Sequence, residues 1–294
     1  MTMLPEPLML PGRAWRATGP LSALVALLLP ASALTGASLP DPAPAAANLV
    51  VTPTRIVLEG RARSVEVYLH NSGDAPGTYR ISLIEKDMDV HGHAVAKAKA
   101  EAEAGTSAAS LLRYSPKQVV LAPGATQTVR IQVRKPEHLP AGEYRSHFLF
   151  RAVPEVPETP GAASGSGISV SIKAIFGVSI PVIVRHGQVQ AKGTLSHLSL
   201  RQDGGRRVLD FHLNREGNRS LYGDLLATWQ PRGGKPVAAG KLNGVAIYAN
   251  LPVRKMSLPL AEPNNQTWRP GTLKVSYREP GTQTIIAEAS LELR

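Results

Sequence analysis

Residues 168–184 read ISVSIKAIFGVSIPVIV, with an apolar side chain at almost every second position. Successive side chains of a β-strand point to opposite faces, so this spacing predicts a strand with one apolar face. The expected strand is longer than the usual five or six residues. Its alternating apolar members are Ile168, Val170, Ile172, Ala174, Phe176, Val178 and Ile180. A flexible loop, PEVPETPGAASGSG, precedes it.

Shorter segments with the same alternation precede this strand. Residues 65–69, 79–83 and 129–133 each alternate apolar and polar side chains, which is typical of half-buried strands. Turn signals such as Pro123-Gly124 separate them. Residues 48–186 hold about seven such segments, the number that an immunoglobulin-like sandwich needs.

A second set of strands is expected from Gln188 onward. It includes 206–214, 221–230, 244–249 and 272–278, with Asn243-Gly244 as a tight turn. We place a domain boundary near 186, where Arg185-His186-Gly187 is expected to form a hinge. The sequence therefore predicts an all-β protein with an immunoglobulin-like β-sandwich over 48–186 and a second β domain over 187–294.

Composition agrees with this fold class. The chain has 294 residues and a net charge of +11, and its length suggests two compact units. Aromatic residues make up 5%, so the core must be built mainly from Val, Ile, Leu and Ala. There is no cysteine, which excludes disulfides, thiol chemistry and cysteine-ligated zinc.

Residues 1–47 have the layout of a secretory signal and linker. Arg13 and Arg16 precede the apolar run LSALVALLL, and small residues suited to cleavage follow. Cleavage after Ala33 or after Ala47 fits, and we favour Ala47 because a strand-like sequence begins at the next residue. Later segments fall short of the ~18 apolar residues of a membrane helix. We therefore expect an exported protein whose mature chain has no integral membrane segment, with the periplasm as its best-fitting location.

The segment 94–112, AVAKAKAEAEAGTSAASLL, interrupts the β pattern. Its Ala, Lys and Glu content favours a helix or a mobile loop. We expect an exposed insertion between two strands.

The sequence carries no recognised catalytic motif. G-x-S-x-G and H-E-x-x-H are absent, and Gly233-Gly234-Lys235 is followed by proline, so it is not a phosphate loop. His91 and His93 have no obvious third metal ligand and are expected in a solvated loop. The basic residues are dispersed without interleaved aromatics, which argues against nucleic-acid binding. We expect a protein that is not an enzyme and has no cofactor and no metal site.

Four parts of residues 49–186 together resemble the PapD-like periplasmic chaperones of the chaperone/usher pilus pathway. The first is LVVTPTRIVLEG at 49–60, similar to the opening strand of that family. The second is Tyr114-Ser-Pro with LAPG at 121–124 and the V-R pair at 129–130. The third lies within 139–154, and the fourth is the long alternating strand closed by an arginine.

The resemblance implies two immunoglobulin-like domains set at an angle, in a boomerang arrangement with a cleft. It also implies that the 168–180 strand completes a secreted pilin-like or coat subunit that lacks one strand, with an outer-membrane usher as the next partner. Unpaired backbone groups and alternate apolar side chains suit such strand donation. We expect Val178 and Ile180 to face the protein's own core. The expected groove-filling residues are Ile168, Val170, Ile172, Phe176 and, as a small member, Ala174.

Arg55 matches the family arginine that holds the subunit's terminal carboxylate, and its forked guanidinium suits two oxygens. The family's second anchor is a lysine late in the long strand, but residues 180–184 contain no lysine, and Lys173 lies too early. Arg185 either supplies this missing charge or acts in an interdomain salt bridge, for which Glu143 is the nearby acidic candidate.

The sequence is thus interpreted as that of a periplasmic chaperone. It would bind secreted fimbrial or coat subunits by donor-strand complementation and deliver them to an usher. The alternative is an extracellular or periplasmic immunoglobulin-like adhesion or structural module. A hydrolase is the weakest alternative, because no nucleophile and base can be paired.

Overall fold

The computed structural model describes residues 48–97, 105–154, 175–262 and 268–294. The expected leader, the segment 98–104 and the strand residues 168–174 therefore lie outside the described residues. The described chain is built of strands, so the all-β prediction is confirmed. No helix within the described ranges has the length and apolar character that crossing a membrane requires.

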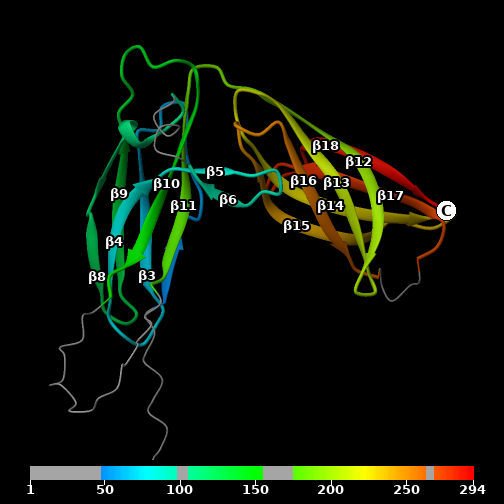
Figure 1. Cartoon of the computed structure of the whole chain (residues 1–294), viewed down its shortest axis with the longest axis horizontal. Coiled ribbons are helices and arrows are strands. Elements are labelled where there is room, and N and C mark those ends of the chain that lie inside the picture. The colour runs from blue at the N-terminus through cyan, green and yellow to red at the C-terminus, as the bar shows by residue number, and fades with distance from the viewer. Residues whose placement is uncertain (1–47, 98–104, 155–174, 263–267) are drawn as a thin grey trace, which may run out of the picture. The chain divides into compact units, whose positions relative to one another are not determined.

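Strands between Leu49 and His186 form two facing sheets (Figure 1). One has the order β1-β3-β9-β7 and the other the order β2-β11-β10-β4-β8. This division of successive strands is the immunoglobulin-type arrangement. The strands are β1 (Leu49–Thr52), β2 (Ile56–Leu58), β3 (Ser64–Asn71), β4 (Gly77–Ile84), β7 (Leu112–Ser115), β8 (Gln118–Leu121), β9 (Thr126–Val133), β10 (Gly142–Ala152) and β11 (Gly177–His186).

Two of the changes of sheet in this first sandwich occur at a proline. Pro53 lies between β1 and β2, and Pro116 lies between β7 and β8. Proline has no N–H to donate to a ladder, so pairing within one sheet ends there and the chain can join the other sheet.

Both inner faces of the first sandwich supply its core. The strands predicted at 65–69, 79–83 and 129–133 are confirmed as parts of β3, β4 and β9. Phe148 on β10 is fully buried, and the ring of Tyr114 meets it edge to face with 4.9 Å between centroids. Such pairs add to the free energy of simple area burial.

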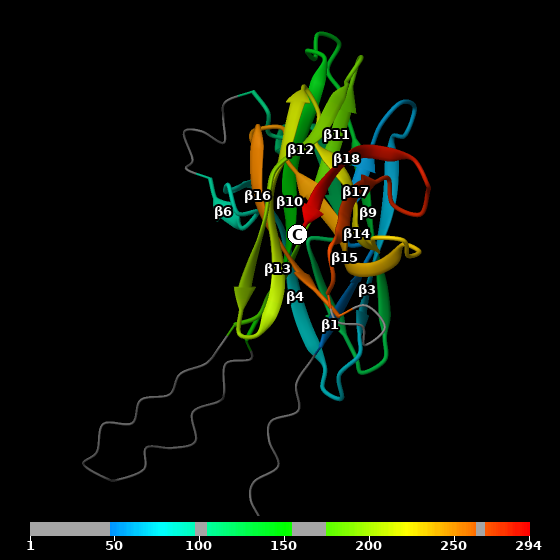
Figure 2. The ribbon, with the colours of Figure 1, turned by 90° about the vertical axis from the view of Figure 1, so that its right-hand side faces the viewer.

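Strands between Ala191 and Leu293 form a second pair of sheets, with orders β12-β13-β16 and β15-β14-β17-β18. In Figure 2, β12, β13 and β16 lie side by side. Their core contains the fully buried Trp229 and Tyr277. The strands are β12 (Ala191–Asp203), β13 (Arg206–Gly217), β14 (Leu221–Pro231), β15 (Val237–Ile247), β16 (Val253–Leu260), β17 (Gly271–Arg278) and β18 (Ile285–Leu293).

Gly187 lies in the short link between β11 and β12, in the segment expected to act as a hinge. Its φ of +64° suits glycine, and a Cβ there would lie 2.6 Å from the Cβ of Ala141. A larger residue would therefore strain this link.

The tight turn predicted at Asn243-Gly244 is wrong. Both residues lie inside β15, which begins at Val237 rather than at 244. The register with β14 shifts between Gly223 and Leu225, so β15 carries an extra residue, a β-bulge. Gly244 has a φ of +68°, and this conformation serves a bulge as well as a turn, which is why the dipeptide was ambiguous.

The exposed insertion expected at 94–112 is wrong at its C-terminal end. Ala94–Ala96 is exposed, as expected, but it forms strand β6, which pairs with β5 (Lys86–Met88) in a hairpin. Ala109–Leu111 is a 3-10 helix, η1, and Leu111 and Leu112 are buried in the first core. Strand pairing with β5 and burial of the leucines outweigh the local preference for helix.

The strand predicted at 168–184 is described from residue 175 onward, and within that part β11 begins at Gly177. Ile175 and Phe176 precede it with 44% and 78% exposure. Val178 packs partly buried against the first core, and Ile180 is 2% exposed within it. These two residues face their own sandwich, as the sequence predicts.

Candidate functional site

One edge of β11 is open along its first half. β10 pairs with β11 over its whole length, but β2 pairs with the opposite edge only at Val182–Val184. Within the described ranges, no strand pairs with that edge along Gly177–Pro181. Pro181 fits this place, because sheets hold proline where no ladder donor is needed. The open edge can accept a strand from another chain.

Arg55 lies where this open edge ends, directly before β2. Its guanidinium carbon lies 4.4 Å from the ring centroid of Tyr222. Its buried Nη2 atom has no hydrogen-bond partner among the described residues, and burial lowers the pKa of Arg55 below its ordinary value. Arg55 is thus a half-buried cation with unused donor capacity.

Arg185 and Glu143, the predicted interdomain candidates, are in contact. Arg185 Nε donates to Glu143 Oε2 at 3.2 Å, and its Nη1 donates to Glu59 Oε2 at 2.8 Å. Glu143 Oε2 also accepts from the backbone N–H of Ser220 at 3.0 Å and from its hydroxyl at 2.9 Å. Glu143 therefore links the two sandwiches, and Arg185 is already neutralised by two carboxylates.

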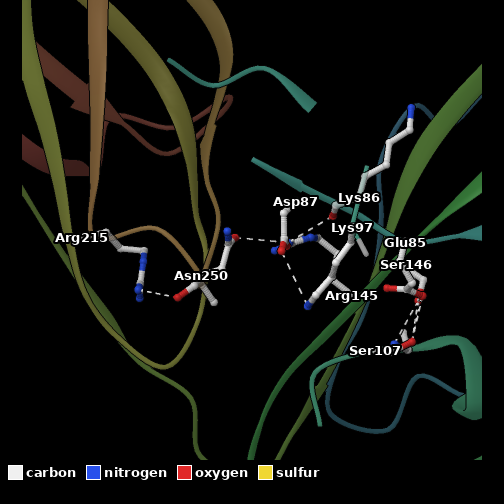
Figure 3. Close-up of polar contacts among 11 residues, drawn as sticks. Glu85, Lys86, Asp87, Lys97, Ser107, Arg145, Ser146, Arg215 and Asn250 are labelled. Carbon is white, nitrogen blue, oxygen red and sulfur yellow. Dashed lines mark hydrogen bonds and ion pairs between the residues drawn. The ribbon is translucent and has the colours of Figure 1, made fainter. Parts of the chain in front are cut away.

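The sequence interpretation missed the role of Arg145. Figure 3 shows its side chain between Asp87 and Asn250. Arg145 Nη2 donates to Asp87 Oδ1 at 2.7 Å and to Asn250 Oδ1 at 3.3 Å, and its guanidinium lies 3.9 Å from the ring centroid of Tyr248. Arg145 thus connects β10 to the second sandwich. The available signal was the polar side chain at every second position of this strand, at 143, 145 and 147.

The β5–β6 hairpin makes a further connection between the sandwiches. Met88 packs in a buried cluster with Ala246 and Tyr248. In the hairpin loop, the carbonyl of Val90 accepts the backbone N–H of Lys255 on β16 at 2.7 Å. The loop thereby meets an edge of the second sandwich by a backbone hydrogen bond.

His91 and His93 lie in this same loop. Asp89 Oδ1 accepts both of their backbone N–H groups, and Asp89 Oδ2 lies 3.1 Å from His93 Nδ1. Within the described residues, no group of three metal-ligating side chains gathers here or elsewhere. The loop is organised by the aspartate.

His147 is a buried titratable group on the outer face of β10. His147 is 4% exposed, and within the part of the chain that the structure describes its Nδ1 has no hydrogen-bond partner. Burial, together with the positive charges of Arg145, Lys86 and Arg55, lowers its pKa to about 4. His147 is therefore neutral at pH 7, and its neighbours show that this face is rich in cations.

We expect His147 to make stability depend on pH. The unfolded chain takes up this proton near pH 6.5, whereas the folded chain does so only near pH 4. Stability is therefore complete above pH 6.5 and falls by about 3 kcal/mol as the pH drops toward 4. Urea denaturation at several pH values should show this loss, and His147→Leu should flatten the profile. If His147→Leu loses as much stability as the native chain when the pH falls, other groups cause the pH dependence.

The chain matches no family model and no curated protein. Three solved structures illustrate its similarities. The YadV chaperone is 14% identical, with 83% of this chain and 99% of that chain covered and a TM-score of 0.42. The chaperone–tip adhesion subunit complex of archaic Csu pili from Acinetobacter baumannii is 13% identical, with 84% of this chain and 98% of that chain covered and a TM-score of 0.42. The SafB chaperone in complex with the SafA pilin of Salmonella enterica is 15% identical, with 84% of this chain and 97% of that chain covered and a TM-score of 0.40.

Proposed function

We propose that this chain is a periplasmic chaperone that binds secreted fimbrial or coat subunits by donor-strand complementation and delivers them to an outer-membrane usher. The observation that carries the proposal is the open edge of β11, which ends at Arg55. Residues 1–47 act as the export signal and linker, and 48–186 is the chaperone domain that holds this edge. Residues 187–294 form the C-terminal domain.

The geometry specifies the direction of the added strand. β2 runs parallel to β11, with Ile56 opposite Val182. A strand in line with β2 along Gly177–Pro181, and parallel to β11, would bring its carboxyl end to Arg55. An antiparallel strand would bring its amino terminus there, and two positive charges would repel. The guanidinium therefore favours a parallel strand that ends in a carboxylate.

The apolar side chains that would fill the subunit's groove precede this edge. Phe176 is 78% exposed and directly precedes β11. Ile168, Val170, Ile172 and Ala174 lie outside the described residues, and we assign them to the groove-filling set by their alternation with Phe176. Burial of each large apolar side chain would contribute ~1.5–3 kcal/mol, so these residues supply affinity and Arg55 sets the register.

The test is subunit recovery. The full chain is co-expressed with the secreted subunit genes that neighbour its own gene, and the complex is purified from the periplasm. Replacing Val170 and Ile172 with glutamate should lower recovery more than about tenfold, because two groove contacts are lost. Val120→Glu is the matched control, since Val120 is 71% exposed on β8 at the opposite edge of the same sheet. Unchanged recovery with the double variant would reject strand donation, and location of the chain on the cell surface would favour the adhesion module.

A further inference from the structure

A β-bulge in β12 turns a histidine away from the core of the second sandwich. Ser196 lies opposite His212 on the outer face of the sheet, and the register with β13 then shifts by one residue before Ser199. If the alternation continued, His197 would follow Ser196 by pointing into the core. The extra residue instead leaves Leu198 packed against the core and His197 exposed on the outer face.

The bulge holds His197 in a backbone conformation that few side chains adopt. Its φ is +55°, and among the described residues it is the one non-glycine residue with a positive φ. Glycine takes this conformation without steric cost, yet a histidine stands here. Strained positions of this kind cluster at functional sites, which points to a role of the imidazole itself.

The ring of His197 lies against the ring of His212 on β13. The two centroids are 4.5 Å apart, and the planes are inclined by 34°. A metal ion 2.0–2.1 Å from one nitrogen of each ring would lie roughly 3.2 Å from both centroids. With the centroids 4.5 Å apart, these distances give an angle of about 90° at the ion, as between neighbouring ligands of square-planar Cu²⁺.

Neighbouring side chains orient the His197 ring. Its Nδ1 lies 3.0 Å from Ser196 Oγ, and this oxygen also accepts a hydrogen bond from Asn214 Nδ2 at 2.9 Å. When Nδ1 carries the proton and donates it to Ser196, the lone pair of Nε2 is free for a metal ion. Histidines that bind metals use their other ring nitrogen in this way. Within the described residues, the His212 ring makes no hydrogen bond, so its lone pair is free as well.

The nearest charged groups are an ammonium and a carboxylate that already has partners. Lys255 lies opposite His212 on β16 and is exposed, so its charge weakens the binding of a cation. Asp210, two residues before His212, binds Arg201 at 2.8 Å and Ser257 at 2.6 Å. The two imidazoles are therefore the available ligands. Such a set suits copper, nickel or zinc rather than calcium or magnesium, which prefer oxygen.

We infer that His197 and His212 form a binding site for a divalent transition-metal ion, with Cu²⁺ as the ion that fits best and water as the remaining ligands. Cu²⁺ is the strongest binder of the divalent first-row series. The inference is independent of the proposed function, because it uses neither the open edge of β11 nor the groove-filling residues.

Calorimetric titration of the full mature chain with Cu²⁺, without a histidine tag, tests the inference. The chain should bind one ion, and electron paramagnetic resonance should show two nitrogen ligands. His197→Gly should weaken binding at least about tenfold, and so should His212→Asn. Glycine accepts the positive φ, so His197→Gly should keep or raise the thermal stability of the metal-free chain, and its loss of binding cannot come from unfolding.

A change of charge gives a second test of the same site. Lys255→Gln should strengthen the binding of Cu²⁺ about threefold, because it removes a repelling charge beside His212. Lys192→Gln is the matched control. Lys192 lies opposite Glu216, four residues from His212 along β13, and its loss should leave binding unchanged. Equal effects of the two substitutions would mean that net charge alone governs binding.

The double variant His91→Asn with His93→Asn controls for the other histidine pair, whose rings are 6.3 Å apart in the β5–β6 loop. It should bind Cu²⁺ as the native chain does. Undiminished binding in His197→Gly would overturn the inference, and so would loss of binding in this double variant alone. Subunit recovery is measured without added metal, so the failure of either proposal leaves the other standing.

Discussion

Glu143→Ala should lower the free energy of unfolding by about 3–5 kcal/mol. The carboxylate side chain is 1% exposed and accepts hydrogen bonds from Arg185 and from both donors of Ser220. Alanine would leave the Ser220 N–H and hydroxyl without this acceptor. It would also leave Arg185, which is 11% exposed, with the Glu59 carboxylate as its remaining partner. Buried donors that lose their partners carry the full desolvation cost.

Glu59→Ala is the matched control for this prediction. Glu59 binds the same arginine at 2.8 Å, but its side chain is 61% exposed. Exposed ion pairs contribute about 0–1 kcal/mol, so this variant should unfold close to the native chain. Urea denaturation followed by circular dichroism measures both variants. Equal destabilisation by the two substitutions would mean that burial of Glu143 and its bonds to Ser220 do not matter to stability.

Phe148→Ala should destabilise the first sandwich by about 3–5 kcal/mol. Phe148 is fully buried on β10, between the two sheets, and its ring lies against Tyr114 and Phe150. Alanine would remove these contacts and leave a cavity that the close-packed sheets cannot fill. Val120→Ala, at a side chain that is 71% exposed, should change stability by less than about 0.5 kcal/mol.

The Phe148→Ala variant also reports whether the two sandwiches unfold together. The three tryptophans are Trp15 in the expected leader and Trp229 and Trp268 in the second sandwich, so fluorescence of the mature chain follows the second sandwich. Circular dichroism follows both. In Phe148→Ala the dichroism should fall at a lower urea concentration than the fluorescence. Coincident transitions with reduced stability would show that the contacts through Glu143 and Arg145 make the two sandwiches one cooperative unit.

Local patterns predicted most of the strands correctly. The alternation in β3, β4 and β9 is a property of a few neighbouring residues, and it states which side chains face a core before the partner sheet is known. The same alternation placed Ile180 in the first core. The errors arose where one local signal serves two structures. A positive φ at Gly244 suits a bulge or a turn, and the pairing partner decides between them.

The sequence singled out some of the residues that lie at this place. Arg55, Arg185 and Glu143 stand in segments that resemble a known family, and the structure brings the latter two together. Arg145 stands in the same segment as Glu143, but its role was missed, because a charged residue in a strand usually points to solvent. Its importance comes from burial, which depends on contacts between segments far apart in the chain.

The sequence alone determined that this protein is made of strands, which faces of those strands are apolar, and where two sets of strands divide. These features follow from the stereochemistry of neighbouring residues and from the need to bury apolar side chains. Only the tertiary structure decided that β2 stops short and leaves an edge of β11 open, and that Glu143 binds Ser220. Residues far apart in the sequence can lie side by side once the sheets pack. Contacts between them therefore depend on the whole fold.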